Sequence, residues 1–351
     1  DPLEVFTYNG ENITESEYAK VMSQVKDACD IMVSAGKECP TIFEIETAVA
    51  FLWFYEKKPD VVLLETGMGG ELDATNLITH PLASVITSIS MDHMQFLGDT
   101  IASIARAKAG IIKVGCPVYA AEQNQVVKEV LTAVASEKDA PIVFADTQTD
   151  ILLEDKPGNM AFSHVLASGV GITLKTVMAG VYQVKNAALA AEVAYALLPV
   201  LMSNEKKEAE GRSYAKSLEE HILEIIRDGM EKTRWPGRFE VVSTEPFLVI
   251  DGAHNEDAAK QLAATIENCF TNTRLTYIIG VLADKEHEKM LRIMSPFAKR
   301  VYTVTPHNAR ALDAERLAKE ASNYYENVQA CESVEKALEE ALSHEEPVLA
   351  F

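Results

Sequence analysis

Short apolar runs alternate with amphipathic segments along most of the chain. Asp60–Leu64 (DVVLL) is one such run, and its position between a proline and a glycine-rich loop is typical of a strand buried on both faces of a parallel sheet. Further strands are predicted at Ser84–Ile89, Pro117–Ala120, Phe247–Ile250, Thr276–Ile279, Val301–Val304 and 347–351. Helices are predicted at 16–35, Ile45–Tyr55, Ile101–Ala109, Gln125–Ser136, Lys185–Leu198, Ser217–Asp228, Ala258–Ile266, Glu286–Met294 and Ala314–Ser322.

Two of these helices have end signals in the sequence. Gly36 closes the first helix, because glycine is favoured just past a helix end. Thr41 and Glu44 form the T-x-x-E pattern of a capping box at the start of the second.

Strands that alternate with helices predict a doubly wound α/β fold. Residues 151–178 are richer in Ser, Gly and Thr and predict a small antiparallel sheet, whereas the charged stretch Asn204–Arg212 predicts a solvated loop. The α/β pattern restarts near Arg234-Trp235-Pro236-Gly237. The sequence therefore predicts two domains, 1–233 and a smaller one at 234–351, with the Pro-Gly pair as the hinge.

Composition and charge narrow the class of partner. The 351 residues include 32 Lys and Arg against 53 Asp and Glu, a formal net charge of −21. Most of such a surface repels phosphate backbones and anionic membranes, so we expect neither nucleic acid nor a membrane as a partner. An anionic small substrate would need a local positive site or a metal.

The five cysteines are widely spaced and form no CxxC or CxxH pair, so we expect inert thiols in a reducing compartment. The sequence has neither an apolar run of about 18 residues nor a charged-then-apolar leader, and a cytoplasmic location is predicted. The chain opens with Asp1-Pro2-Leu3 and stops directly after a predicted strand. We therefore expect it to be a portion of a longer chain.

A glycine-rich loop, Glu65 to Asn76, follows the first predicted strand. Ligands of open α/β sheets bind at the carboxyl ends of strands, and the carboxylate of Glu65 is an oxygen ligand suited to Mg²⁺. His93 follows the next strand and could complete a metal site with Glu65. A glycine-rich turn with a solvated glutamate, and a structural histidine, are the alternatives.

Lys108 falls at the end of a predicted helix, where a basic residue is favoured by the helix dipole. The alternative is a lysine held among metals and anions. The pKa of a lysine moves readily on burial, and the neutral amine can add CO₂ to give a carbamate.

The hinge and the strand that follows it carry further candidates. The guanidinium of Arg238 suits phosphate oxygens, although an interdomain ion pair is the alternative. Asp251 directly follows the strand Phe247–Ile250 and could bind ribose hydroxyls. Asn255 could equally cap the next helix.

Six stretches, taken in order, resemble the folylpolyglutamate synthase/dihydrofolate synthase family of the wider Mur ligase superfamily. They span almost the whole chain: ETGMGGELDATN, SVITSISMDHMQFLGDTIASIARAKAGIIK, RWPGRFEVV, DGAHNEDAA, GVLADKE and HNARALDAERLA. The resemblance implies a P-loop ATPase-like doubly wound domain, incomplete here, followed by a smaller Rossmann-like domain.

The resemblance also implies an ATP-dependent ligase that adds L-glutamate to a folate and, in bifunctional members, to dihydropteroate. In this family a folate or pteroate carboxylate attacks the γ-phosphate of ATP, and the amine of glutamate displaces phosphate from the resulting acyl phosphate. Mg²⁺ and basic side chains offset the charge of the anions that meet in the site. A monomer is expected.

For the metal site, the resemblance implies that Glu65 and His93 are Mg²⁺ ligands, and His93 is also a catalytic candidate. Lys108 corresponds to the catalytic lysine that is often carbamylated in this superfamily.

For the nucleotide site, Asn186 matches a family position near the adenine, and Arg238 resembles the family's catalytic arginine at the γ-phosphate. Asp251 matches the ribose-binding acid. His254 and Asn255 belong to the same DGAHN stretch, where the family binds nucleotide or glutamate.

The chain also departs from the family pattern. The P-loop GTNGKGS is absent and is expected upstream of Asp1, and a C-terminal segment is expected after Phe351. Glu71 stands where arginine is common, and Tyr182 stands where histidine is common. The alternative functions are a catalytically silent nucleotide-binding protein of the same fold and a sister Mur-type ligase for another acceptor or amino acid.

Overall fold

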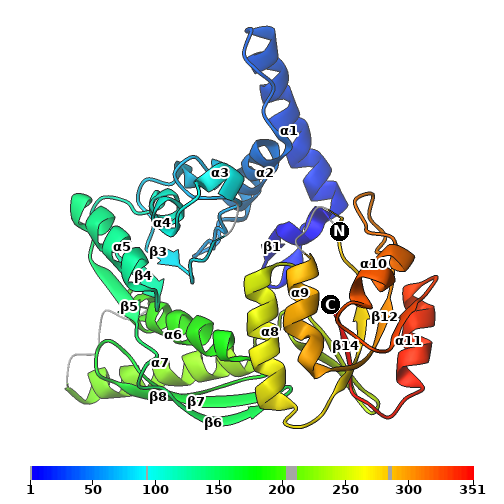
Figure 1. Ribbon diagram of the computed structural model, residues 1–351. Coiled ribbons are helices and arrows are strands. Elements are labelled where there is room, and N and C mark those ends of the chain that lie inside the picture. Colours follow the sequence, from blue (N-terminus) through cyan, green and yellow to red (C-terminus); the bar gives the residue numbers. More distant parts are fainter. Residues whose placement is uncertain (1, 92–93, 203–211, 284–286) are drawn as a thin grey trace. The chain divides into compact units, whose positions relative to one another are not determined.

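The computed structural model describes residues 2–91, 94–202, 212–283 and 287–351 (Figure 1). The described chain forms two compact units. The first comprises 1–84, 91–117 and 125–141, and the second comprises 85–90, 118–124 and 142–351. The domain boundary at residue 234 stays a prediction.

The first unit is mainly helical. Its elements are η1 (Pro2–Val5), β1 (Thr7–Tyr8), β2 (Glu11–Asn12), α1 (Glu15–Ser34), α2 (Ile42–Lys57), η2 (Ala74–Leu77), α3 (Met94–Leu97), α4 (Ile101–Ala109) and α5 (Gln125–Glu137). Helix α2 begins at the predicted capping box, in which the Glu44 N–H donates to the Thr41 hydroxyl and the Thr41 N–H donates to the Glu44 carboxylate. Gly36, with φ +79°, follows the end of α1 as predicted.

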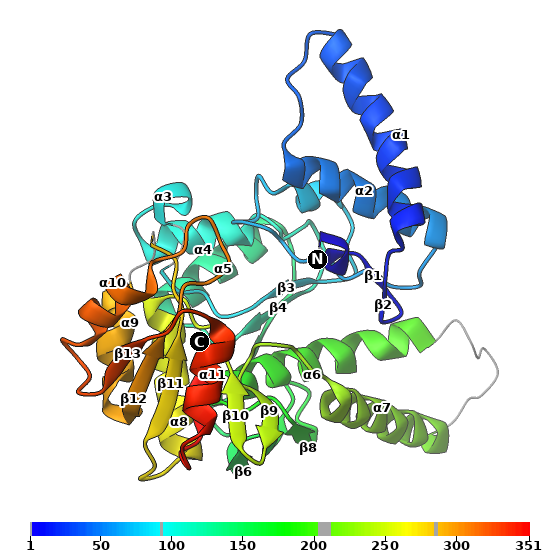
Figure 2. The same cartoon turned by 90° about the vertical axis from the view of Figure 1, so that its right-hand side faces the viewer.

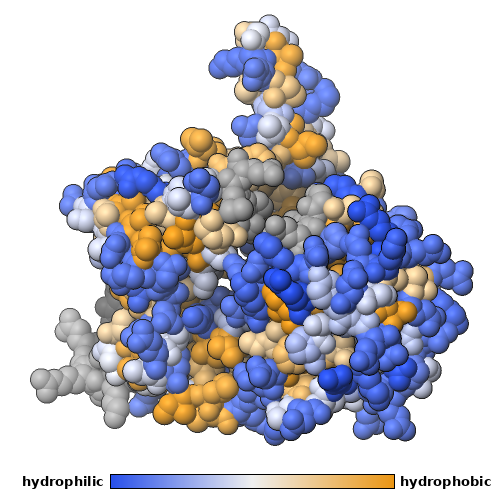
Figure 3. All heavy atoms as spheres, viewed as in Figure 1, coloured by the Kyte–Doolittle hydropathy of each residue, from blue (hydrophilic) through white to orange (hydrophobic). Residues whose placement is uncertain are grey.

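The predicted strand Asp60–Leu64 is wrong. The segment is extended, but within the described part of the chain no strand pairs with it, and Leu63 is 92% exposed. An apolar run supplies the side chains of a buried strand, but its N–H and C=O groups need neighbouring strands to accept and donate hydrogen bonds. Other apolar side chains of this unit are exposed near the end of α1, including Ile31 and Val33. Figure 3 shows apolar residues on the surface of this helix among hydrophilic ones.

The second unit contains two small sheets. Strands β3 (Ser84–Ile86), β4 (Val118–Ala121) and β5 (Ile142–Ala145) form one, in which β4 and β5 are parallel. Strands β6 (Ile151–Lys156), β7 (Asn159–Val165) and β8 (Gly171–Thr176) form the predicted antiparallel sheet.

Helices α6 (Val181–Met202) and α7 (Arg212–Lys232) pack on this antiparallel sheet. Phe162 and Leu174 of the sheet are buried with Val184 of α6 and Ile222 of α7. Among the described residues, α6 is the helix whose length and composition would allow a membrane crossing, a test that core helices of globular proteins also pass. The predicted loop Asn204–Arg212 lies outside the described residues except for Arg212, which begins α7.

A six-stranded sheet completes the unit, in the order β13-β12-β11-β14-β10-β9. All pairs are parallel except β9 with β10. Its strands are β9 (Glu240–Thr244), β10 (Phe247–Ile250), β11 (Leu275–Ile279), β12 (Ala298–Thr303), β13 (Val328–Ala330) and β14 (Val348–Ala350).

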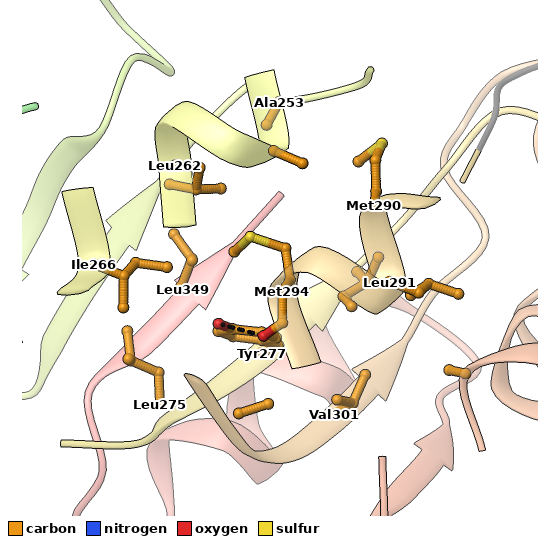
Figure 4. Packing of buried hydrophobic residues seen from close by; sticks show 14 of the residues in the cluster. Ala253, Leu262, Ile266, Leu275, Tyr277, Met290, Leu291, Met294, Val301 and Leu349 are labelled. Atoms are coloured by element: carbon orange, nitrogen blue, oxygen red, sulfur yellow. Dashed lines mark hydrogen bonds between the residues drawn. The ribbon is translucent and has the colours of Figure 1, made fainter. Parts of the chain in front are cut away.

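Helices cover both faces of this sheet (Figure 2). On one face, α8 (Glu256–Cys269), α9 (His287–Met294) and α10 (Ala314–Ala321) pack around Tyr277, whose hydroxyl donates to the Met294 carbonyl at 3.3 Å (Figure 4). On the other face, α11 (Val334–Leu342) buries Ala337 against Ile278. The doubly wound α/β fold predicted from the sequence is confirmed here.

Candidate functional site

In the first unit, the glycine-rich loop packs directly on the carboxyl end of α4. The Glu71 N–H donates to the Ala107 carbonyl at 3.0 Å, and the Asn76 amide donates to the Gly110 carbonyl at 3.1 Å. Two glycines permit the approach: a Cβ at Gly70 would lie 2.8 Å from the Lys108 carbonyl oxygen, and a Cβ at Gly110 would lie 2.4 Å from the Glu71 Cα. The structure therefore brings two predicted motifs together through their backbones.

Glu65 and Lys108, two of the residues predicted to act at the metal, lie in this unit. Glu65 is exposed in the loop and does not follow a strand, and Lys108 is half-buried on α4. His93 lies outside the described residues. Over the described ranges, no three His, Cys, Asp or Glu side chains converge as a metal site. An exposed carboxylate nevertheless fits Mg²⁺, which proteins commonly hold through one or two carboxylates, with water and substrate phosphates as the remaining ligands.

In the second unit, Arg238 is exposed on a loop whose backbone is held on both sides. The N–H of Gly237 donates to the Glu240 carboxylate at 2.8 Å, and its carbonyl accepts from the Gly252 N–H at 2.7 Å. Phe239, on the other side, donates its N–H to Asp251 Oδ2 at 2.8 Å. Sequence reasoning missed Phe239, since nothing in the local pattern marks it.

Asp251 directly follows β10, as predicted, and is only 8% exposed. Its Oδ2 accepts from Phe239 and its Oδ1 accepts from the Ala253 N–H at 2.9 Å. Burial raises the pKa of Asp251, while the two backbone donors and the positive charge of Arg238 oppose that rise.

His254 and Asn255 follow in the same loop. The exposed His254 donates from Nδ1 to the Gly252 carbonyl at 2.9 Å, so its Nε2 is an acceptor when the ring is neutral. Asn255 is the N-cap of α8, because its side-chain oxygen accepts from the Ala258 N–H at 2.8 Å. The capping interpretation of Asn255 is therefore correct, whatever else the residue does.

The first turns of α6 carry Asn186, which is exposed and donates from its amide to Gln183 Oε1 at 3.1 Å. Its neighbour Lys185 lies 3.4 Å from Glu122 at the end of β4. Tyr182 is the second residue of α6. Burial and the nearby Asp251 raise the pKa of Tyr182 to about 12, so this phenol stays protonated at neutral pH.

Gln123 was not predicted as a site residue, although it joins two strand ends. Its Oε1 accepts from the Ile89 N–H at 3.0 Å, and its amide donates to the Thr87 carbonyl at 2.8 Å. A lone glutamine after a strand gives no sequence signal for this bridge, because the partners lie more than 30 residues away.

Two family models match the chain. The Mur ligase middle domain matches residues 11–194, and the Mur ligase glutamate ligase domain matches residues 237–348. Together with the α/β fold, these matches define the class of the protein as a Mur ligase.

Proteins similar to this chain indicate a narrower family within the Mur ligases. The dihydrofolate synthase/folylpolyglutamate synthase of Bacillus subtilis is 34% identical over 91% of this chain and 71% of its own length. The folylpolyglutamate synthase of Mycobacterium tuberculosis, complexed with ADP and AMPPCP, superposes on 100% of this chain and 79% of its own, with a TM-score of 0.81 and 27% identity. A folylpolyglutamate synthase complex with AMPPCP and folate gives a TM-score of 0.74 and 26% identity over 99% of this chain and 78% of its own.

The chain belongs to the folylpolyglutamate synthase/dihydrofolate synthase family of the Mur ligases. Members of this family are ATP-dependent ligases that form amide bonds. The resemblance found in the sequence motifs is thereby confirmed.

Proposed function

We propose that this protein joins L-glutamate to a folate through an amide bond at the expense of ATP, and that dihydropteroate is a second acceptor. The observation that carries the proposal is the pair of family matches, because a middle domain and a glutamate ligase domain follow one another in a single chain. The Bacillus subtilis relative bears both activities in its name.

The proposed reaction has two steps. A folate carboxylate oxygen attacks the γ-phosphorus of ATP, and the bond to the β–γ bridging oxygen breaks to release ADP. The glutamate amine then attacks the acyl carbon, loses a proton, and expels inorganic phosphate. Both steps gather anions, so basic side chains that bind phosphate oxygens are needed.

Arg238 is proposed as the catalytic residue that binds the γ-phosphate. Its guanidinium is exposed, its backbone is held, and its planar fork suits phosphate oxygens. Asn186, Asp251, His254 and Asn255 are proposed for the nucleotide. The acceptor Nε2 of His254 can receive a hydrogen bond from a ligand hydroxyl or amine.

Glu65 and His93 are proposed as Mg²⁺ ligands, and His93 is also proposed as a catalytic residue. Mg²⁺, when bound, would offset the charge of the phosphates. Lys108 is proposed as a catalytic residue that acts as a carbamate, which a half-buried amine beside the loop could form. We further propose a cytoplasmic monomer whose partners are small molecules, in keeping with the net charge of −21.

The test is ADP release by the purified full-length protein with Mg·ATP, L-glutamate and either a reduced folate or dihydropteroate. We expect release only when an acceptor and glutamate are both present. Tight ATP binding without release would favour a catalytically silent protein. Release with another amino acid or a cell-wall precursor alone would favour a sister ligase.

A further inference from the structure

The loop that leads into β9 presents a tryptophan to solvent. Trp235 is 61% exposed, whereas Trp53, the other tryptophan of the 351 residues, is 2% exposed and packs against the rings of Tyr8 and Phe54. Tryptophan is highly buried on average, because exposure of its large apolar ring to water is unfavourable. The exposed indole of Trp235 therefore offers an aromatic face on which a flat ligand can stack.

Residues 235–238 form a β-turn. The Arg238 N–H donates to the Trp235 carbonyl at 3.4 Å, Pro236 occupies the second position, and Gly237, with φ +71°, occupies the third. Proline followed by a glycine with positive φ is the pattern of a type II turn. The two ends of the turn thus carry an indole and a guanidinium, and the Cα atoms at the ends of a β-turn lie less than about 7 Å apart.

Hydrogen bonds hold the turn on both sides. Before it, the guanidinium of Arg234 donates to the Glu231 and Thr233 carbonyls at 2.6 and 3.1 Å, where α7 ends. After it, the Gly237 N–H donates to the Glu240 carboxylate at 2.8 Å. An aromatic side chain on a fixed backbone loses little conformational freedom when it binds a ligand, which favours binding.

An indole and a guanidinium at this spacing suit a ligand in which an aromatic ring lies next to an anionic group. The indole stacks on a flat ring, and the guanidinium binds carboxylate or phosphate oxygens. In dihydropteroate, the reacting carboxyl group is bonded directly to a benzene ring. In ATP, by contrast, the ribose and the α- and β-phosphates separate the adenine from the γ-phosphate.

We propose that Trp235 is a substrate-binding residue that stacks on the benzene ring of dihydropteroate and thereby favours this acceptor over a folate. The inference rests on the proposed function, because Arg238 at the γ-phosphate brings the attacking carboxylate, and the ring bonded to it, beside the same turn. In a folate, a glutamyl residue separates the benzene ring from the reacting carboxylate. The ring of a folate therefore lies farther from the γ-phosphate and gains less from the indole.

Steady-state kinetics of the full-length enzyme test the contact. Trp235→Ala should raise KM for dihydropteroate by about 10-fold, because a stacked aromatic pair is lost. KM for ATP and for a reduced folate should change less than about threefold. Trp235→Phe should recover most of the affinity for dihydropteroate, since phenylalanine keeps a ring that can stack.

Tyr55→Ala is the matched control. Tyr55 is 78% exposed on α2, so this substitution also removes an exposed aromatic side chain, and it should leave all three KM values unchanged. Equal rises in KM for ATP and for dihydropteroate in Trp235→Ala would overturn the proposal and indicate adenine binding. A Trp235→Phe variant as impaired as Trp235→Ala would also overturn it, because stacking needs only a ring.

Fluorine NMR with fluorine-labelled tryptophan separates this inference from the proposed function. The Trp235 resonance is identified by its loss in Trp235→Phe. Dihydropteroate added in the presence of AMPPCP should shift this resonance beyond the shift given by AMPPCP alone, and it should leave the Trp53 resonance in place, whether or not the protein has ligase activity. An unshifted Trp235 resonance, or one that AMPPCP alone shifts as far, would refute the stacking contact. Absence of glutamate-dependent ADP release in the unmutated protein would refute the proposed function and leave the binding result intact.

Discussion

His164 Nδ1 donates to Asp150 Oδ1 at 2.9 Å, and the two side chains are 0% and 5% exposed. A second carboxylate, that of Glu192 on α6, lies 3.7 Å from His164 Nε2, which is an ion-pair distance and too long for a hydrogen bond. Glu192 also accepts from the Ala167 N–H at 2.6 Å. A histidine of β7 is therefore buried between two carboxylates.

This cluster predicts a pH-dependent stability. Burial lowers the pKa of His164, but Glu192 and Asp150 more than offset it, so the net pKa lies above 6.5. Burial also raises the pKa of Asp150, where Asp146 and Glu122 add negative charge. Both groups bind their proton more tightly when folded. The contribution of His164 is therefore complete below pH 6.5 and is lost as pH rises through its folded pKa.

We expect the free energy of unfolding to fall above pH 6.5 by at most about 1.4 kcal/mol per pH unit from this histidine. His164→Gln should lower stability by about 3 kcal/mol near pH 6 and flatten the fall with pH. Urea unfolding between pH 6 and 9 measures both quantities. His221→Gln is the control, because His221 is exposed and its Nδ1 lies 3.8 Å from a carboxylate oxygen at the surface. An unchanged pH slope in His164→Gln would contradict the assignment.

Gly110→Ala should destabilise the protein by about 1–3 kcal/mol, because its Cβ would overlap the backbone of Glu71. Thermal unfolding measures the effect. Gly171→Ala is the matched control, since a Cβ there meets open space, and it should stay within about 0.5 kcal/mol. Equal effects of the two substitutions would show that the loop can move away from α4.

Asn255→Ala should cost about 1 kcal/mol of stability, because the first turn of α8 loses its cap. Asn255→Ser should restore most of it. Comparison of ATP affinity in the two variants then separates the cap from a nucleotide contact. If Asn255→Ser is stable but binds ATP weakly, the side chain also binds the nucleotide.

Lys108→Ala should lower turnover by about 10²-fold or more if its carbamate lies among the reacting anions. Bicarbonate should restore the activity of the unmutated enzyme after CO₂ depletion but should not affect the variant. Arg106→Ala on the same helix is the control, because Arg106 is exposed and pairs with Glu137 at 3.7 Å. Full activity in Lys108→Ala would remove the catalytic role.

The local sequence pattern correctly predicted the helices and strands that are specified by interactions between residues close together in the chain. The Thr41–Glu44 capping box, the helix Ile101–Ala109 and the strand Phe247–Ile250 all form where expected, because caps and hydrophobic periodicity act within a few residues. Weaker signals were missed: the short strands β9 and β13 and the helix α11 were not predicted.

The candidate site was predictable in part. Residues placed by strand ends and caps, such as Asp251 and Asn255, were found, whereas the strand before Glu65 was predicted and does not form. A segment forms a strand only when neighbouring strands accept and donate its backbone hydrogen bonds. The sequence of Asp60–Leu64 does not specify those neighbours.

The amino-acid sequence by itself determined the family, the α/β class and the order of most of the helices and strands, because short motifs and the period of apolar residues specify them. Only the tertiary structure decided that Asp251 holds the Phe239 peptide, that His164 lies between Asp150 and Glu192, and that Gly110 meets Glu71. These contacts join residues from about 12 to 39 positions apart, and such pairs meet only when the packing of whole elements brings them together.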